Sequence, residues 1–413
     1  MGYNDIGRTL PQAGTIPSMT LVDTDMFLNV LRRTQLLAPE QVEQIQRDLL
    51  PHYPDPESLA RYLVEIDWLT PYQMQLFLSG RWDEIVIGPY QVLDRLGEGG
   101  VSEVFKAWDT LRGRVVALKV LRQDLGAHDD LARQFQQEHQ AITRLNHPNI
   151  IKTFDAGHTK GLFYFAMECV EGMDLERYVR LVGPLSVEVA CDYARQAAQG
   201  LQHAHGNGLV HRDIKPANLF LIHPPLPNGR KGPEPVVKIL DWGLARCIPA
   251  EGETVLEHEG EKGRLIGTAD YIAPEQIEDA TLVDIRADIY SMGCVLYFLL
   301  TGQPPFRGNS LMQKIVQHRE APPPSVRELR PDVPEELDHF IIKLLSKSPE
   351  QRVQIPLLLV AALRKFTSGQ TGSGVAARAI PAPGTALNLP RPQTHATLSR
   401  PTTHPTLQRP EDK

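Results

Sequence analysis

The feature that most constrains this chain is an eight-residue run, His-Arg-Asp-Ile-Lys-Pro-Ala-Asn at residues 211–218, followed by Asp241 after a strand-like segment. Asp213 can accept or orient the proton of an attacking hydroxyl, and Lys215 can offset charge on a moving phosphoryl group. Asn218 and Asp241 carry the hard oxygen donors that Mg²⁺ prefers. A base, a cation and two metal ligands in this order predict a site for phosphoryl transfer from ATP.

A glycine-rich loop lies upstream, between strand-like segments at residues 90–95 and 104–108. Glycines let the backbone approach phosphate oxygens because no Cβ stands in the way. Gly-x-Gly also occurs in ordinary hairpins, so the loop alone is a weak signal. Its nine residues are candidate ATP contacts: Leu96, Gly97, Glu98, Gly99, Gly100, Val101, Ser102, Glu103 and Val104.

A candidate phosphate-binding lysine follows the loop. Residues 116–119 alternate as a strand does, which would turn Lys119 toward a cleft. A lone strand lysine is usually a solvated surface charge, but its position after the glycine loop favours a role in binding. Residues 131–145 have the apolar spacing of a helix, and Glu138 within them could pair with Lys119.

Taken in order, these elements resemble the eukaryotic-like, or Hanks-type, serine/threonine protein kinases, particularly the bacterial branch, over residues 88 to about 366. The stretch Gly-Thr-Ala-Asp-Tyr-Ile-Ala-Pro-Glu at residues 267–275 and Lys215 favour the Ser/Thr branch over the tyrosine branch. The resemblance implies an α+β, bilobal fold with a small β-rich N-lobe and a larger helical C-lobe. It also implies transfer of the γ-phosphoryl group of ATP to Ser/Thr hydroxyls of proteins in signalling, with ATP and Mg²⁺ as cofactors.

The resemblance also implies roles for single residues. Its catalytic residues are Asp213 as the base, Lys215, Lys119 and Glu138. Its metal ligands are Asn218 and Asp241. Its further nucleotide contacts are Ala117, Lys119, Met167 as the gatekeeper, Glu168 and Val170 in the adenine hinge, and Asp174 at the ribose.

Four more residues match positions of this family's C-lobe, and the last three of them look structural. Thr268 would bond to Asp213 and order the shelf that receives the protein substrate. Glu275 and Arg352 would form a buried ion pair, and Asp288 would anchor the backbone of the catalytic loop.

Three departures from the family pattern stand out. Ser102 takes the place of the third glycine of the loop, and Trp242 replaces the usual phenylalanine after the metal-binding aspartate. Residues 223–235 form a Pro/Gly-rich insertion between two strand-like runs, which indicates a surface loop. In related kinases the aromatic residue at this position stacks in a column of side chains that links the two lobes. The resemblance implies that the column here consists of Thr153, Ile142, Trp242 and His211.

Two other functions stay open at this stage. A pseudokinase would keep the fold as a binding module without catalysis, but Lys119, Glu138, Asp213, Asn218 and Asp241 are all present. A small-molecule kinase of related fold would not normally keep the substrate shelf. An active protein kinase is therefore the favoured interpretation.

The flanking regions differ in composition. Residues 1–20 and the Pro/Thr-rich residues 367–413 are expected to be disordered. Residues 21–87 predict a small module with helices at residues 23–33, 39–49, 56–66 and 71–78, three of which begin at a proline. This module could stabilise the kinase domain, residues 88–366, or serve in docking or regulation. The tail could also serve in docking.

Candidate phosphorylation sites follow from the same reading. Between Asp241 and Glu275 the hydroxyl residues are Thr254, Thr268 and Tyr271. Thr268 and Tyr271 fall in the substrate shelf, so Thr254 is the expected activation-loop site. A nine-residue repeat in the tail also places threonines beside arginines, and its candidates for autophosphorylation are Thr394, Thr397, Thr403 and Thr406.

Composition limits the partners and the compartment. The net charge of −7 gives no reason to expect nucleic-acid binding. The four cysteines are widely scattered, which suits a reducing cytoplasm. The apolar segments 295–300 and 357–363 are shorter than the ~20 residues that a bilayer needs, so we expect no membrane span and read both as buried helix segments.

Overall fold

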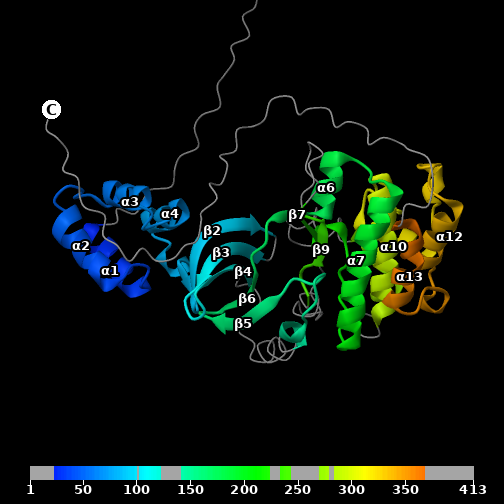
Figure 1. The fold of residues 1–413 in the computed structure, drawn as a ribbon, viewed down its shortest axis with the longest axis horizontal. Coiled ribbons are helices and arrows are strands. Elements are labelled where there is room, and N and C mark those ends of the chain that lie inside the picture. The colour runs from blue at the N-terminus through cyan, green and yellow to red at the C-terminus, as the bar shows by residue number, and fades with distance from the viewer. Residues whose placement is uncertain are drawn as a thin grey trace, which may run out of the picture. The chain divides into compact units, whose positions relative to one another are not determined.

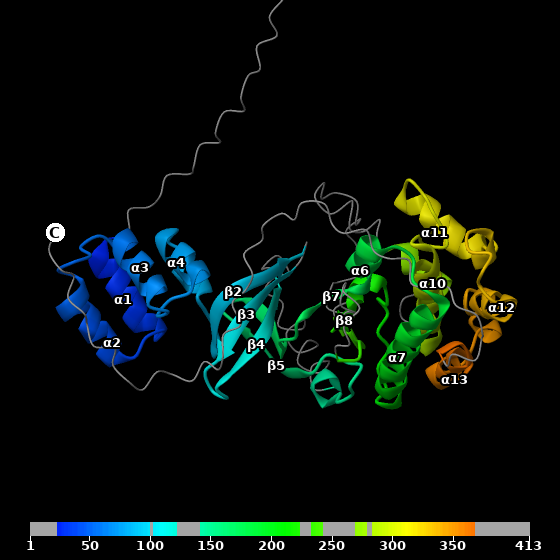
Figure 2. The same ribbon diagram turned by 45° about the horizontal axis from the view of Figure 1, so that its top comes forward.

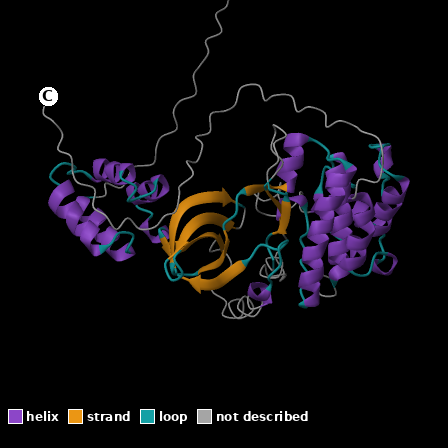
Figure 3. Ribbon diagram, viewed as in Figure 1, coloured by secondary structure: helices purple, strands orange, loops and turns teal. Residues whose placement is uncertain are grey.

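The computed structural model describes residues 23–99, 102–121, 141–223, 233–242, 269–278 and 283–367. Within them, a group of short helices comes first, then a β-sheet, then a larger helical lobe (Figures 1 and 3). The β-rich lobe and the helical lobe agree with the bilobal α+β fold expected from the sequence. The predicted disordered ends, residues 1–20 and 367–413, lie outside the described residues apart from Thr367, which ends a helix.

The N-lobe is a six-stranded antiparallel sheet in the order β1-β2-β3-β4-β6-β5. On β4, Val116, Leu118 and Val120 join one core, while Lys119 falls on the opposite face because side chains alternate along a strand. The predicted strand at residues 116–119 is therefore confirmed. The strand bounds are β1 Val86–Ile87, β2 Tyr90–Glu98, β3 Ser102–Asp109, β4 Arg114–Leu121, β5 Thr153–Thr159 and β6 Leu162–Glu168.

A second, three-stranded sheet lies at the junction of the two lobes, in the order β7-β8-β9. Its strands are β7 Gly172–Asp174, β8 Leu219–Ile222 and β9 Val236–Ile239. β8 and β9 pair antiparallel from Leu219↔Ile239 to Ile222↔Val236, which confirms the two strand-like runs around the predicted insertion. Residues 224–232 of that insertion lie outside the described residues.

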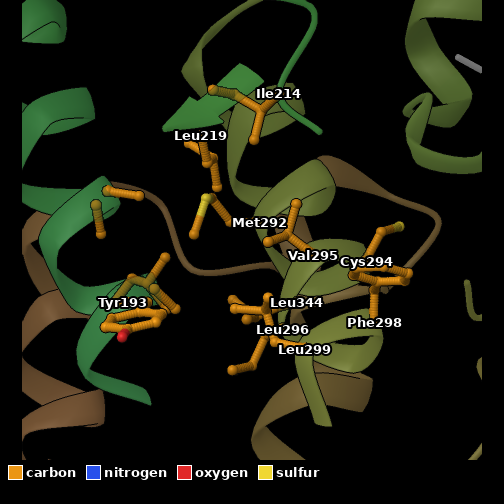
Figure 4. Close-up of a cluster of buried hydrophobic side chains, with 14 of the residues drawn as sticks. Tyr193, Ile214, Leu219, Met292, Cys294, Val295, Leu296, Phe298, Leu299 and Leu344 are labelled. Carbon is orange, nitrogen blue, oxygen red and sulfur yellow. The ribbon is translucent and has the colours of Figure 1, made fainter. Parts of the chain in front are cut away.

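The C-lobe is built around α7 and α10, which pack against each other. α10 is buried along most of its length, and Figure 4 shows its Met292, Val295 and Leu296 in one cluster of buried side chains with Tyr193 of α7 and Leu344 of α12. A Cβ on Gly200 of α7 would lie 2.8 Å from the backbone oxygen of Asn149, so only glycine allows this approach. The helices are α6 Leu175–Val182, α7 Val187–Gly206, α9 Pro274–Glu278, α10 Ile285–Thr301, α11 Leu311–Glu320, α12 Glu335–Leu344 and α13 Pro356–Thr367. Short 3₁₀ turns are η2 Trp82–Glu84, η4 Pro216–Asn218, η5 Ala269–Tyr271, η6 Val326–Glu328 and η7 Pro349–Gln351.

The two apolar segments differ in burial. The segment at residues 295–300 is buried in α10, as expected. The expectation for residues 357–363 is wrong in part, because Leu357 and Leu358 are 54% and 53% exposed. α13 packs on α7 through one face only, which holds Leu359 and Leu363. Among the described residues, no helix is both long and apolar enough to cross a membrane.

The N-terminal helices occupy the predicted positions. They are α1 Thr24–Thr34, α2 Pro39–Gln44 continued by the π-helical turn η1 Ile45–Leu49, α3 Pro56–Glu65 and α4 Pro71–Leu78. Asp23, Asp55 and Thr70 cap α1, α3 and α4, each accepting a hydrogen bond from a backbone N–H of the first turn. Phe27 and Phe77 form the centre of their core, with ring centroids 4.8 Å apart.

Candidate active site

The loop at residues 211–218, expected to be the catalytic loop, is anchored by a side chain of α10. The carboxylate of Asp288 accepts hydrogen bonds from the backbone N–H of His211, at 2.8 Å, and of Arg212, at 2.7 Å. Arg212 has a left-handed backbone, with φ of 68°, which such a clamp can hold in place. Burial raises the pKa of Asp288, and the nearby His211 and the two N–H donors act in the opposite direction. The anchoring role expected for Asp288 is confirmed.

Asp213, Lys215 and Asn218 form one hydrogen-bonded group. The ammonium of Lys215 donates to Asp213 Oδ2 at 2.8 Å and to Oδ1 at 3.1 Å. Asn218 Nδ2 donates to the backbone oxygen of Asp213 at 2.7 Å and to its Oδ2 at 3.0 Å. Because the amide nitrogen of Asn218 faces Asp213, its amide oxygen is the atom that a cation would meet.

Lys119 and Asp241 bring the two lobes together. Lys119 Nζ lies 2.6 Å from Asp241 Oδ1, and the lysine side chain is only 7% exposed. Asp241 follows β9 and has a left-handed backbone, with φ of 61°. Burial would raise the pKa of Asp241, but the charge of Lys119 and its hydrogen bond outweigh burial and lower that pKa. Asp241 is therefore an ionised carboxylate at the interface of the lobes.

The ion pair expected in the C-lobe is present. Arg352, 2% exposed, contacts Glu275 with two parallel bonds, Nη1 to Oε1 at 2.6 Å and Nη2 to Oε2 at 2.8 Å. Its guanidinium also donates to three backbone oxygens, those of Ser346, Lys347 and Arg286. This pair fixes the start of α9 against the rest of the lobe.

The chain's similarity to known proteins agrees with this geometry. Residues 90–361 match the family model described as the protein kinase domain. The chain belongs to the protein kinase family.

Relatives of this kinase come from several bacteria. Serine/threonine-protein kinase PknB of Mycolicibacterium smegmatis is 39% identical over 287 residues, which are 68% of this chain and 43% of that protein. Serine/threonine-protein kinase PrkC of Bacillus subtilis is 35% identical over 65% of this chain and 39% of its own length. The chain thus spans less than half the length of these curated relatives.

A solved kinase domain has the same fold. The crystal structure of the Mycobacterium tuberculosis PknI kinase domain is 26% identical in sequence, with a TM-score of 0.53. The match covers 68% of this chain and 98% of the PknI chain.

In this kinase the described residues of the glycine loop, 96–99 and 102–104, lie at the facing ends of the paired strands β2 and β3. The paired region extends further than the sequence predicted, since Gly97 pairs with Val104 and Glu98 with Glu103. The predicted strands stopped short because glycines and charged residues break the hydrophobic pattern, whereas backbone pairing does not require apolar side chains. At the tip, Gly99 N donates to Ser102 O at 2.7 Å. Leu96 is half-exposed and Ser102 is buried.

The expected nucleotide contacts on β4 and β6 are neighbours. Ala117 lies opposite Met167, and Glu168, the last residue of β6, lies opposite Val116. The Glu168 side chain pairs with Lys238 at 2.7 Å and accepts from Lys152 N at 2.8 Å, so the start of the hinge is fixed by charge. These two partners were not predicted.

Val170 and Asp174 follow the hinge. Val170 is half-buried. Asp174 caps α6 by accepting from Arg177 N at 2.7 Å, a structural role that the sequence reading missed. An Asp directly before an amphipathic helix is a typical cap signal and could have shown it.

Trp242 occupies the expected column. It is 4% exposed, and its ring meets that of His211 edge-on, with centroids 4.8 Å apart. Ile142 and Thr153 line the same small cavity as Trp242, of about 20 Å³. Among the described residues, the indole N–H of Trp242 has no hydrogen-bond partner.

Five predicted site residues lie outside the described residues: Gly100, Val101, Glu138, Thr254 and Thr268. Two contacts in the C-lobe had no signal in the sequence, because they join residues far apart in the chain. Gln276 Nε2 donates to the backbone oxygen of Arg212 at 2.7 Å, and Lys314 pairs with Asp270 at 2.5 Å.

Proposed function

We propose that this chain is an active serine/threonine protein kinase in signalling, which transfers the γ-phosphoryl group of ATP to protein hydroxyls. The observation that carries the proposal is the convergence of Lys119 from the N-lobe with Asp241, together with the bonded group of Asp213, Lys215 and Asn218. Phosphoryl transfer depends mainly on positioning and on charge stabilisation, and this arrangement supplies both.

Asp213 is the proposed base. Its carboxylate is held by Lys215 and Asn218, so it would orient the substrate hydroxyl and receive its proton. Lys215, at 2.8 Å from Asp213, would stabilise negative charge on the transferred group. Lys119 would hold the phosphates of ATP, with the β2–β3 hairpin covering them.

The donor set fits Mg²⁺. Asp241 supplies an ionised carboxylate and Asn218 an amide oxygen, both hard ligands, and Mg²⁺ is usually bound by one or two protein groups together with substrate phosphates and water. When bound, Mg²⁺ would offset the charge of the phosphates.

A pseudokinase is the main alternative. It is disfavoured because the described catalytic side chains form two bonded groups, Lys119 with Asp241 and Asp213 with Lys215 and Asn218. A small-molecule kinase is less well supported, since the names of the relatives are those of serine/threonine-protein kinases.

We also infer a division of the chain into a helical module, residues 21–87, and the kinase domain, residues 88–366. A cytoplasmic, reducing location rests on the cysteines, of which Cys169, Cys191 and Cys294 are free thiols. Docking of protein substrates through the helical module or the tail remains a prediction.

The test is direct transfer. The full chain is incubated with γ-labelled ATP and Mg²⁺, with and without a generic protein acceptor, and the labelled residues are mapped by mass spectrometry. Label on serine or threonine supports the proposal. ATP binding with no transfer to any protein would favour the pseudokinase.

A further inference from the structure

The strand that leads to the glycine loop is irregular. β2 has two register shifts against β3, one between Val92 and Asp94 and one between Arg95 and Gly97. At each bulge the extra residue loses its place in the ladder, and its backbone groups need other partners. The shape of β2 just before the loop therefore depends on contacts from outside the sheet.

At the first bulge, those contacts come from α4 of the N-terminal helices and from its N-cap residue. Gln73 Nε2 donates to Val92 O at 2.7 Å, and Thr70 Oγ1 donates to Leu93 O at 2.6 Å. Gln73 is 4% exposed, so its bond to Val92 is shielded from water. Figures 1 and 2 both show α4 beside β2.

The same two side chains also begin the helix. Gln73 N donates to Thr70 Oγ1 at 3.1 Å, and Thr70 N donates to Gln73 Oε1 at 2.9 Å, which is a capping box. Thr70 and Gln73 therefore satisfy the helix start and the bulged strand together. A shift of α4 would remove hydrogen bonds from both.

Apolar packing joins the two parts as well. Tyr72 packs against the core of the N-terminal helices and against the N-lobe core, with its ring centroid 6.2 Å from that of Phe105. Ile85 is buried in the first core and Ile87 in the second. The helices are thus a continuation of the N-lobe and not a loosely attached domain.

We propose that Thr70 and Gln73 are positioning residues for the nucleotide site, acting through the bulge of β2 on the glycine loop. Gly97 is four positions after Leu93, about 13 Å of strand at ~3.3 Å per residue. The two hydrogen bonds to the bulge keep the β2–β3 hairpin in one conformation. If that conformation becomes less populated, the apparent affinity for ATP falls by the same factor. The inference rests on the proposed function, in which this hairpin binds ATP.

The test uses Gln73→Glu in the full chain. Glutamate keeps the oxygen that accepts from Thr70 N, so the capping box remains, but it has no donor for Val92 O. If the glutamate variant does not fold, Gln73→Met is measured against the same control; it adds no charge but lacks the acceptor for Thr70 N as well as the donor for Val92 O. The matched control is Asp23→Ala, which removes the cap of α1 and leaves β2 untouched.

Two quantities are measured: the Kd for a non-hydrolysable ATP analogue with Mg²⁺, and amide hydrogen exchange in peptides that cover residues 92–99. We expect the Gln73 variant to bind about three- to tenfold more weakly, the effect of one lost hydrogen bond, and to exchange faster in that segment. Asp23→Ala should resemble the wild type in both.

Wild-type values for the Gln73 variant, or equal changes in Asp23→Ala, would overturn the inference while leaving the proposed function intact. A wild-type chain that binds no nucleotide would instead refute the proposed function, and with it this role for Thr70 and Gln73.

Discussion

Lys119 Nζ lies 2.6 Å from Asp241 Oδ1 and so links strand β4 of the N-lobe to the end of β9. The lysine is almost completely buried, and the aspartate is about a quarter exposed. Among the described residues, each charge is therefore the main compensation for the other. In the proposed mechanism, Lys119 binds phosphate and Asp241 binds the metal ion. A nucleotide and metal ion bound between the lobes would therefore contact both members of this pair.

The first prediction concerns the stability of that pair. Lys119→Met leaves the partly buried carboxylate of Asp241 without this partner, and we expect the free energy of unfolding to fall by about 1–3 kcal/mol at pH 7. Lys119→Met combined with Asp241→Asn should lose less, because no unpaired, partly buried charge remains. Urea unfolding of the two single variants and the double variant measures this coupling. Strictly additive effects would show that the two residues are not coupled.

The second prediction concerns pH. His318 is completely buried, its Nδ1 lies 2.9 Å from the Tyr290 hydroxyl, and burial followed by the nearby charge of Lys347 lowers its pKa to about 3. The pKa of His318 in the folded protein lies below its unfolded value of ~6.5. Above pH ~6.5 the ring is neutral in both states, so its contribution to stability is fully present. This stability is lost as the pH falls from ~6.5 toward 3, by up to about 1.4 kcal/mol per pH unit.

His318→Asn is the matched variant, because it keeps a polar atom near Tyr290 but does not titrate. Melting temperatures at pH 7, 6, 5 and 4 should decline more steeply for the wild type than for this variant. Parallel curves would mean that His318 is not the group responsible.

The third prediction concerns the Trp242 column. Trp242 and Thr153 line one cavity of about 20 Å³, in which the large indole is matched by a small neighbour. Trp242→Phe should enlarge the cavity and lower stability by about 1–2 kcal/mol. Adding Thr153→Leu should restore much of the loss by refilling the space. A double-mutant cycle with no interaction energy would contradict this compensation.

The sequence predicted those parts of the site whose chemistry is local. The run at residues 211–218 fixes Asp213, Lys215 and Asn218 within one short loop, so their bonds follow from adjacent residues. The proline-led starts of α2, α3 and α4 were equally local signals. Family resemblance added the long-range pair of Glu275 and Arg352.

Contacts that depend on tertiary packing were beyond the sequence. Gln73 looks like an ordinary polar helix residue, yet it is buried against Val92 O. Leu357 looks like part of a buried segment, yet it is exposed, since burial depends on which face of α13 meets α7. His318 likewise carries no local sign that it would be enclosed beside Tyr290.

If Asp213 is the catalytic base, as we propose, turnover by Asp213→Asn should be severely reduced. The control is Asp332→Asn, which alters an exposed carboxylate paired with Arg330 on the surface. Initial rates of transfer from ATP to a protein acceptor, with Mg²⁺, are compared with the Kd for ATP. We predict a loss of about 10²–10⁴-fold in kcat for Asp213→Asn with near wild-type ATP affinity, and no change in the control. Full phosphorylating activity in Asp213→Asn would contradict the account.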